Sequence, residues 1–256
     1  KIPVPPFETQ QKIASILSAY DDLIENNLRR IRLLEEAAQL IYREWFVHLR
    51  FPGYAHTPVE HGLPRGWERK KIGEVCFVNQ NSIKVSNKPE QIYYIDISST
   101  GSGYFEEPQE MSFNEAPSRA RRIVQNGDII FSTVRPNRKT YALILEPRDN
   151  LIVSTGFAVL TPKKFEDFTF IYLTVSNQGF IDKVSMVASG AAYPAISQTD
   201  FENIEVILPS NQLILKLFEI VSPFLFQKEV LLKQNQNLKA ARDILLPRLM
   251  NQTIIV

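Results

Sequence analysis

The chain has 256 residues and a net charge of only +1, because 29 lysines and arginines nearly balance 28 acidic residues. This balance excludes a protein that binds polyanions non-specifically through its overall charge. A single cysteine excludes a disulfide framework and a zinc cluster built from thiolates, and no apolar run reaches the length of a membrane span. We therefore expect a folded cytoplasmic protein. Because the sequence begins with lysine, we also expect it to be a segment of a longer protein.

The first predicted element is a long helix within residues 1–50. The segment Val4-Pro5-Pro6-Phe7 leads into it, as expected of a strand end that is punctuated by proline. Seam residues then recur at alternating steps of four and three, a period of about 3.5 residues that is typical of a coiled coil. These seam residues are Ile13, Leu17, Tyr20, Ile24, Asn27, Ile31, Leu34, Ala38, Ile41 and Trp45.

Residues 51–63 are interpreted as a linker. His48, His56 and His61 lie in or beside this segment. Their spacing matches no zinc template, so we predict a solvated connection and no metal site.

Residues 64–208 are predicted to form a domain with a mixed β-sheet. Short segments rich in Ile, Val, Tyr and Phe are bounded by turn residues, as in strands. Strands do not alternate regularly with helices, so the predicted fold class is α+β. The predicted strands are Trp67–Ile72, Gln91–Ile97, Asp128–Val134, Thr140–Leu145, Thr155–Thr161 and Asn203–Leu208, and the predicted helices are Phe168–Ser176 and Gly179–Val187.

The most strongly charged part of this domain runs from Arg119 to Lys139, with six basic residues and one acid, Asp128. Arginine pairs with guanine and asparagine with adenine, each through two hydrogen bonds, while other polar side chains contact phosphates. We therefore predict DNA contacts here, with a solvated hairpin tip as the alternative. The candidates are Arg119, Arg121, Arg122, Arg135, Asn137, Arg138, Lys139 and Tyr141.

Two further loops are candidates for DNA contact. Ser99-Thr100-Gly101-Ser102-Gly103 offers the hydroxyls of Thr100 and Ser102, and the loop of residues 188–197 offers Ser189 and Tyr193. Small residues allow a close approach of the backbone, and tyrosine can stack or bind a phosphate. The alternative for each loop is an ordinary turn between two elements.

A second long helix is predicted within residues 209–256, and its beginning repeats that of the first. Ile207-Leu208-Pro209 leads into it. Pro223 is expected to kink or split this helix near Ser222. Half of its seam is polar or charged. The seam residues are Leu217, Val221, Phe224, Lys228, Leu231, Asn235, Leu238, Arg242, Leu245 and Leu249.

We expect the two helices to pair with each other as an antiparallel coiled-coil hairpin. Aligning Ile13 with Leu249 places Asn27 beside Asn235, and a buried asparagine pair fixes the register at some cost in stability. Replacing Asn27 alone by leucine is therefore expected to raise thermal stability and loosen the register. The alternative is a generic helical hairpin in which the two asparagines do not meet.

Signatures of catalysis are absent from the sequence. It has no P-loop, no glycine-rich dinucleotide fingerprint and no Gly-x-Ser-x-Gly elbow. The string Pro5-Pro6-Phe7 is similar to a motif of DNA methyltransferases, but Val4 stands where that motif has a polar residue. We predict no catalytic residues.

Several strings together resemble the DNA specificity subunit of type I restriction–modification systems. Glu44-Trp45-Phe46-Val47-His48-Leu49-Arg50-Phe51-Pro52-Gly53 closes the first helix, and Gly62-Leu63-Pro64-Arg65-Gly66-Trp67-Glu68 opens the sheet domain. The proline-then-glutamine helix starts and the Gly127-Asp128-Ile129 turn complete the resemblance.

The resemblance implies a non-catalytic subunit that reads DNA. Such subunits normally carry two target recognition domains, each followed by a long helix, and the helices form a spacer between the two half-sites that are read. This chain has one such domain between two helices, so it is similar to the second half of a full subunit, as a fragment or as a half-length subunit that self-associates.

The partners that the resemblance implies are double-stranded DNA, modification (methyltransferase) subunits and restriction (translocase) subunits, with no membrane partner. S-adenosylmethionine, Mg²⁺ and ATP are expected on those subunits, and no cofactor is expected on this chain. Two alternatives stay open, a stand-alone DNA-modifying enzyme and a coiled-coil adaptor with no role in DNA binding.

Overall fold

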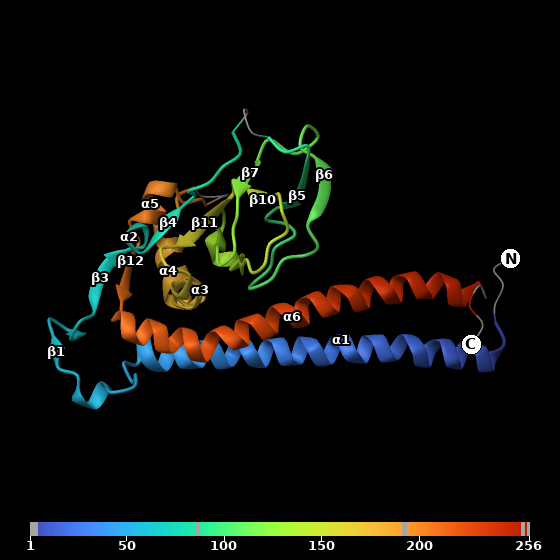
Figure 1. The fold of residues 1–256 in the computed structure, drawn as a ribbon, viewed down its shortest axis with the longest axis horizontal. Coiled ribbons are helices and arrows are strands. Elements are labelled where there is room, and N and C mark those ends of the chain that lie inside the picture. The colour runs from blue at the N-terminus through green and yellow to red at the C-terminus, as the bar shows by residue number, and fades with distance from the viewer. Residues whose placement is uncertain (1–4, 85–87, 191–193, 252–253, 255–256) are drawn as a thin grey trace. The chain divides into compact units, whose positions relative to one another are not determined.

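A computed structural model describes residues 5–84, 88–190, 194–251 and 254 of the chain (Figure 1). The chain divides into two compact units. Residues 1–37 and 223–256 form the first, which we call the hairpin unit, and residues 38–222 form the second, which we call the sheet unit. The two long helices, α1 (Phe7–Tyr42) and α6 (Asn211–Met250), contribute residues to both units.

In the hairpin unit α1 and α6 pair in antiparallel fashion, as predicted. Residue numbers fall along one helix as they rise along the other. The polar contacts that show this are Asp21 with Arg242, Asn27 with Asn235, and Glu35 with Lys228. The predicted seams face inward. Ile13, Ile24, Ile31, Leu231 and Leu249 are buried, and Leu17, Leu34, Leu238 and Leu245 are partly buried.

The two seam asparagines meet, as the alignment predicts. Asn27 Nδ2 donates to Asn235 Oδ1 at 2.9 Å, and Asn235 Nδ2 lies 3.4 Å from the carbonyl oxygen of Ile24. Both asparagines are buried. A buried amide pair favours the register in which its members meet, because a slipped register would leave each amide against apolar side chains.

This hydrogen bond reverses the expectation for leucine at Asn27. The single change Asn27→Leu leaves the buried Oδ1 of Asn235 without this donor, so we expect a loss of about 1–3 kcal/mol. Replacing both Asn27 and Asn235 by leucine is expected to raise the melting temperature above that of the single variant. Circular dichroism melts of the two variants check this order. A double variant that melts below the single one would contradict it.

Pro223 does not split α6, so that part of the expectation is wrong. The helix is continuous from Asn211 to Met250 and contains both Pro223 and Pro247. Proline removes one backbone hydrogen bond. Pro223 is itself exposed, while Val221, Ser222 and Leu225 around it are buried. We infer that this packing offsets the lost bond.

The described residues of the sheet unit form two four-stranded sheets and two short two-stranded ones. The strand orders of the large sheets are β6-β5-β10-β7 and β4-β11-β8-β9. Strands β5 and β10 pair in parallel, and the other pairs are antiparallel. The predicted mixed sheet and the α+β class are thus confirmed. The strands of the large sheets are β4 (Cys76–Val78), β5 (Gln91–Ile95), β6 (Gln109–Ser112), β7 (Ala120–Ile123), β8 (Ile129–Ser132), β9 (Tyr141–Leu143), β10 (Leu151–Ser154) and β11 (Phe157–Pro162).

Four helices accompany these sheets: α2 (Ile72–Val75), α3 (Phe168–Ser176), α4 (Gln178–Val187) and α5 (Gln198–Glu202). Residues 168–175 of α3 are all buried, in agreement with the mostly apolar composition of this helix. The rings of Phe131, Phe180 and Phe201 pack against one another and join β8 to α4 and α5. Every residue of β8 and β10 is buried, so these two strands lie in the core.

The end of α1 belongs to the sheet unit through an aromatic cluster. Phe46 lies between the rings of Tyr42, Trp67 and Phe170, at centroid distances of 5.3, 5.7 and 5.5 Å. The Tyr42 hydroxyl donates to Thr174 Oγ1 at 3.1 Å, and burial raises the pKa of Tyr42 to about 12 despite that hydrogen bond. The sequence segments around Trp45 and Trp67, which carry part of the family resemblance, therefore contribute aromatic side chains to one cluster.

The segment interpreted as a linker has structure of its own. After α1 come a short π-helix (Arg43–Val47) and a 3-10 turn (Tyr54–His56). Strands β1 (Val59–Glu60) and β2 (Leu63–Pro64) then form a small hairpin. Strands β3 (Glu68–Lys71) and β12 (Glu205–Leu208) pair at the two chain ends of the domain. None of the described helices is long and apolar enough to cross a membrane.

Candidate nucleic-acid interface

The three loops that the sequence singled out lie together in the sheet unit. Their centre is the segment of residues 133–141, which we call the basic turn. It connects β8 to β9 and includes the 3-10 turn Pro136–Arg138. Residues 129–145 contain Arg135, Arg138 and Lys139 and no acidic residue. The basic turn therefore carries a local positive charge in a nearly neutral chain.

The loop around Ser102 lies on one side of the basic turn. Ser102 Oγ donates to the carbonyl oxygen of Lys139 at 2.6 Å. The backbone N–H of Gly103 donates to the Tyr141 carbonyl, and the N–H of Tyr141 donates to the Gly101 carbonyl. These bonds join two loops that are far apart in the sequence.

The loop of residues 188–197 lies on the other side. The Arg135 N–H donates to the Pro194 carbonyl at 2.7 Å, and the Ile196 N–H donates to the Thr133 carbonyl at 2.9 Å. Ser189 and Ala195 pair across the loop. Tyr193, the fourth loop candidate, lies outside the described residues.

The candidates differ in what they offer to a ligand. Arg135 and Tyr141 are partly buried, and Tyr141 packs edge-on against Tyr172. Thr100 is buried, and its hydroxyl donates to the Asp96 carbonyl, so it serves the loop's own structure. The exposed candidates are Ser102, Arg119, Asn137, Arg138, Lys139 and Ser189.

The loop that carries Ser102 is organised by Asp96. Burial raises the pKa of this carboxyl, but hydrogen bonds from Ser99 and Ser98 outweigh burial and leave the pKa below its ordinary value. Asp96 Oδ1 accepts from the Ser99 N–H at 2.9 Å and from the Ser98 hydroxyl at 2.9 Å. An ionised Asp96 therefore holds the loop in shape.

Arg119, which directly precedes β7, and the β7 residues Arg121 and Arg122 lie outside the basic turn. Arg119 is exposed, and its carbonyl accepts from the Thr155 N–H. The carbonyl of the next residue, Gly156, accepts from the N–H of Thr133 in the basic turn. The Arg121 guanidinium lies 4.9 Å from the centre of the Phe113 ring. Burial lowers the pKa of Arg122, and its Nε has no hydrogen-bond partner among the described residues.

Sequence reasoning missed one exposed apolar feature of this region. Met186, at the end of α4, is 85% exposed, and Val187 beside it is 47% exposed. They directly precede the loop of residues 188–197, and α4 packs against the 3-10 turn Pro136–Arg138. Residues 179–187 were predicted as a helix, and a single methionine in a short helix gave no signal of exposure.

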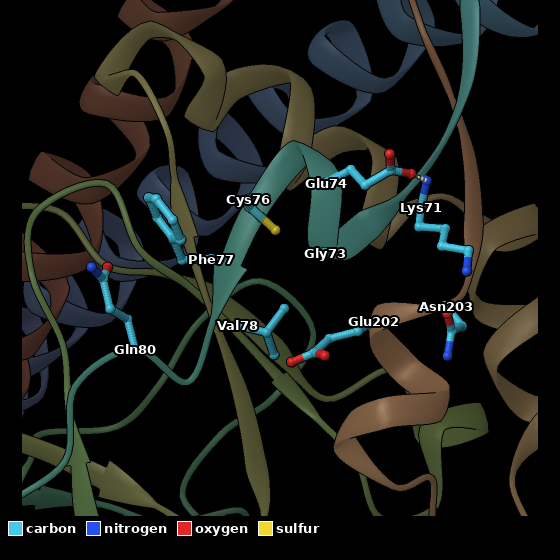
Figure 2. A pocket seen from close by; sticks show the side chains of 9 residues that line it. All are labelled: Lys71, Gly73, Glu74, Cys76, Phe77, Val78, Gln80, Glu202 and Asn203. Carbon is cyan, nitrogen blue, oxygen red and sulfur yellow. Dashed lines mark hydrogen bonds between the residues drawn. The ribbon is translucent and has the colours of Figure 1, made fainter.

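A separate pocket near α2 offers no reactive thiol. Figure 2 shows Cys76 among its lining residues, with Lys71, Glu74 and Glu202. Burial raises the pKa of Cys76 to about 12, and its Sγ lies 3.4 Å from the Ile72 carbonyl oxygen. The described residues contain no cluster of three or more His, Cys, Asp or Glu side chains that could hold a metal ion.

The family model described as the type I restriction modification DNA specificity domain matches residues 1–36 and 64–239. The chain belongs to this family. The match includes most of α1, the sheet unit from residue 64 onward and most of α6, but not residues 37–63.

Curated relatives of this family carry the name specificity subunit. The MjaIX type I restriction enzyme specificity subunit of Methanocaldococcus jannaschii is 27% identical, over 97% of this chain and 59% of its own length. The HindI specificity subunit of Haemophilus influenzae is 20% identical, over 68% of this chain and 38% of its own length. The chain thus spans less than two thirds of either relative.

Solved structures of specificity subunits have a similar fold. The HsdS subunit from Thermoanaerobacter tengcongensis matches with a TM-score of 0.50 and 27% identity, over 75% of this chain and 47% of that chain. The type I S subunit from M. genitalium matches with a TM-score of 0.59 and 19% identity, over 95% of this chain and 61% of that chain, which supports the fold alone.

Proposed function

We propose that the sheet unit is a target recognition domain that reads one half-site of a bipartite DNA target. The observation that carries this proposal is the convergence of three polar loops around the basic turn in a member of the DNA specificity family. Arginine, asparagine and lysine side chains supply both base readout and phosphate contact. The chain itself performs no chemistry in this proposal.

The two long helices are proposed to serve as a spacer and as a scaffold. The 36 residues of α1 span about 50 Å at the rise of an α-helix. A spacer of fixed length sets the distance between two half-sites, because half-site spacing follows from protein geometry. Modification and restriction subunits would dock on the helices and supply S-adenosylmethionine, Mg²⁺ and ATP. The second half-site would be read by another domain of the same subunit or by a second copy of this chain.

Selection from a pool of random DNA duplexes tests the proposal. The full chain is incubated with the pool at low salt, where phosphate contacts are strongest, and the bound duplexes are sequenced. We expect a short motif of fixed bases to be enriched. Bound DNA of random sequence, or no retention of DNA, would contradict sequence recognition by this chain.

A further inference from the structure

The 3-10 turn Pro136–Arg138 is enclosed by two residues in an unfavourable backbone conformation. Arg135 and Lys139 have φ values of 48° and 57°, in the left-handed region that non-glycine residues seldom adopt. Within the turn, the Arg138 N–H donates to the Arg135 carbonyl at 2.9 Å, and the Lys139 N–H donates to the Pro136 carbonyl at 3.0 Å. Such a conformation persists only where the surroundings enforce it.

Neighbouring loops hold Arg135 and Lys139 in this left-handed backbone conformation. Ser102 Oγ donates to the carbonyl oxygen of Lys139 at one end, and the Pro194 carbonyl accepts from the Arg135 N–H at the other. Pro136 is buried, and α4 packs against the turn. The turn therefore has its shape before a ligand arrives, and binding does not have to order it.

The side chains that this rigid turn presents to solvent are few. Asn137, Arg138 and Lys139 are exposed. Within the described part of the chain, the side chains of Asn137 and Arg138 form no hydrogen bond or ion pair. Both side chains are thus available to a ligand with complementary groups, and the backbone that carries them is held in place.

We propose that Asn137 and Arg138 are the base-reading residues of the half-site, which would contain an adenine read by Asn137 and a guanine read by Arg138. The asparagine amide matches N6 and N7 of adenine, and the guanidinium matches O6 and N7 of guanine, both in the major groove. Lys139 contacts phosphate. This proposal rests on the proposed function and assigns its specificity to two residues.

The spacing of the two residues fits neighbouring bases. Adjacent Cα atoms lie about 3.8 Å apart, close to the rise of about 3.4 Å per base pair. Consecutive side chains of a 3-10 turn also point in different directions, since the turn has about three residues per rotation. The short Cα separation therefore allows both residues to read bases of the same half-site, and the selected motif will show how far apart these bases lie.

Ser102 is assigned a positioning role in this arrangement, because its hydroxyl donates to the Lys139 carbonyl and so holds the turn. Ser102→Ala is expected to weaken binding to the selected duplex without changing which bases are selected. Ser102→Thr keeps the hydroxyl and is expected to restore binding. A changed motif in Ser102→Ala would remove the residue from this role.

The test repeats the duplex selection with variants of the full chain. Asn137→Ala is expected to lose preference at one adenine, and Arg138→Ala at one guanine, while the other positions of the motif stay fixed. Each variant is expected to bind the parental motif roughly 10- to 100-fold more weakly, as for loss of one bidentate base contact. Lys139→Ala should weaken binding to all sequences equally and leave the motif unchanged.

A chemical probe isolates the guanine contact. Replacing the guanine at the affected position by 7-deazaguanine removes the N7 acceptor. This change should weaken binding of the duplex by the parental chain and leave binding by Arg138→Ala unchanged. Arg65→Ala is the matched control, since Arg65 is an exposed arginine of the β1–β2 hairpin that pairs with Glu60. It is expected to retain both affinity and motif.

The outcomes separate this proposal from the proposed function. If the parental chain selects a motif and neither Asn137→Ala nor Arg138→Ala relaxes any position, the assignment of the readers is overturned and sequence recognition stands. An equal loss on all sequences in both variants would overturn it as well. If the parental chain selects no motif, the proposed function fails, and the assignment fails with it.

Discussion

Replacing Asp128 by asparagine is expected to stabilise the sheet unit at neutral pH by about 3 kcal/mol, which is what a displacement of roughly two pKa units represents. Asp128 is only 1% exposed, and its burial raises its pKa to about 6, although the Gln125 N–H and the Thr161 hydroxyl lower it. Its Oδ2 accepts from the Gln125 N–H at 2.8 Å, and its Oδ1 has no hydrogen-bond partner among the described residues. A charged carboxylate is therefore held where a neutral amide fits better.

The sign of the pH dependence follows from the raised pKa. The unfolded chain ionises Asp128 near pH 4, and the folded chain ionises it near pH 6. The contribution of this group to stability is therefore present below pH 4 and is lost as the pH rises through 6. The melting temperatures of the parental chain and of Asp128→Asn are measured from pH 4.5 to pH 8. They should diverge as the pH rises, with the variant melting roughly 6–12 °C higher at pH 8.

The exposed Asp149 provides the matched control, because Asp149→Asn removes the same charge from the surface of the sheet unit. Its melting curve is expected to follow the parental curve at every pH. Parallel pH profiles for the parental chain and Asp128→Asn would show that this carboxyl does not titrate between pH 4 and pH 6, and would refute the prediction.

The predicted ranges contain β3, β5, β8, β9 and β12 and most of β11, whereas β6 and β7, two strands with polar faces, were not predicted. β5, β8 and β12 lie within predicted ranges, because their burial depends on their own side chains. β7 reads Ala-Arg-Arg-Ile and β6 reads Gln-Glu-Met-Ser, and both are the outer strands of their sheet. Outer strands gain their hydrogen bonds from a partner that the local sequence does not identify.

One core strand, β10, was not predicted. The predicted strand Thr155–Thr161 omitted β10, since the apolar residues of Leu151–Ser154 and Phe157–Pro162 are separated only by Thr155 and Gly156. The structure has a turn there. A Cβ added at Gly156 would lie 2.5 Å from Ile97 Cδ1, so a larger residue there would displace the end of a side chain distant in sequence.

For the candidate site, the sequence identified the loops but not their roles. Residue types alone marked the basic segment, because arginine, asparagine and lysine carry the chemistry of DNA contact. Thr100 is buried, whereas Asn137 is exposed. This difference depends on how two loops 37 residues apart pack together, as the hydrogen bond from Ser102 to the Lys139 carbonyl shows. The same packing could not be inferred from the composition of either loop.

Removing Glu35 is expected to destabilise the hairpin unit more than removing its partner Lys228. The Lys228 Nζ lies 2.6 Å from Glu35 Oε1, and the side chains of the two residues are 6% and 33% exposed. Glu35→Ala therefore removes one carboxylate from a buried ammonium, and we expect a loss of about 1–3 kcal/mol. Lys228→Met leaves a carboxylate that is already partly hydrated, so we expect a change of less than about 1 kcal/mol.

Urea unfolding of the full chain, followed by the helical signal at 222 nm, measures this difference. Glu36→Ala is the control, because Glu36 is the exposed neighbour of Glu35 on the same helix. The double variant Glu35→Leu with Lys228→Leu is expected to recover the parental stability or exceed it, since well-packed apolar residues can replace a buried ion pair without loss. Equal costs for Glu35→Ala and Lys228→Met would contradict the difference in burial on which the prediction depends.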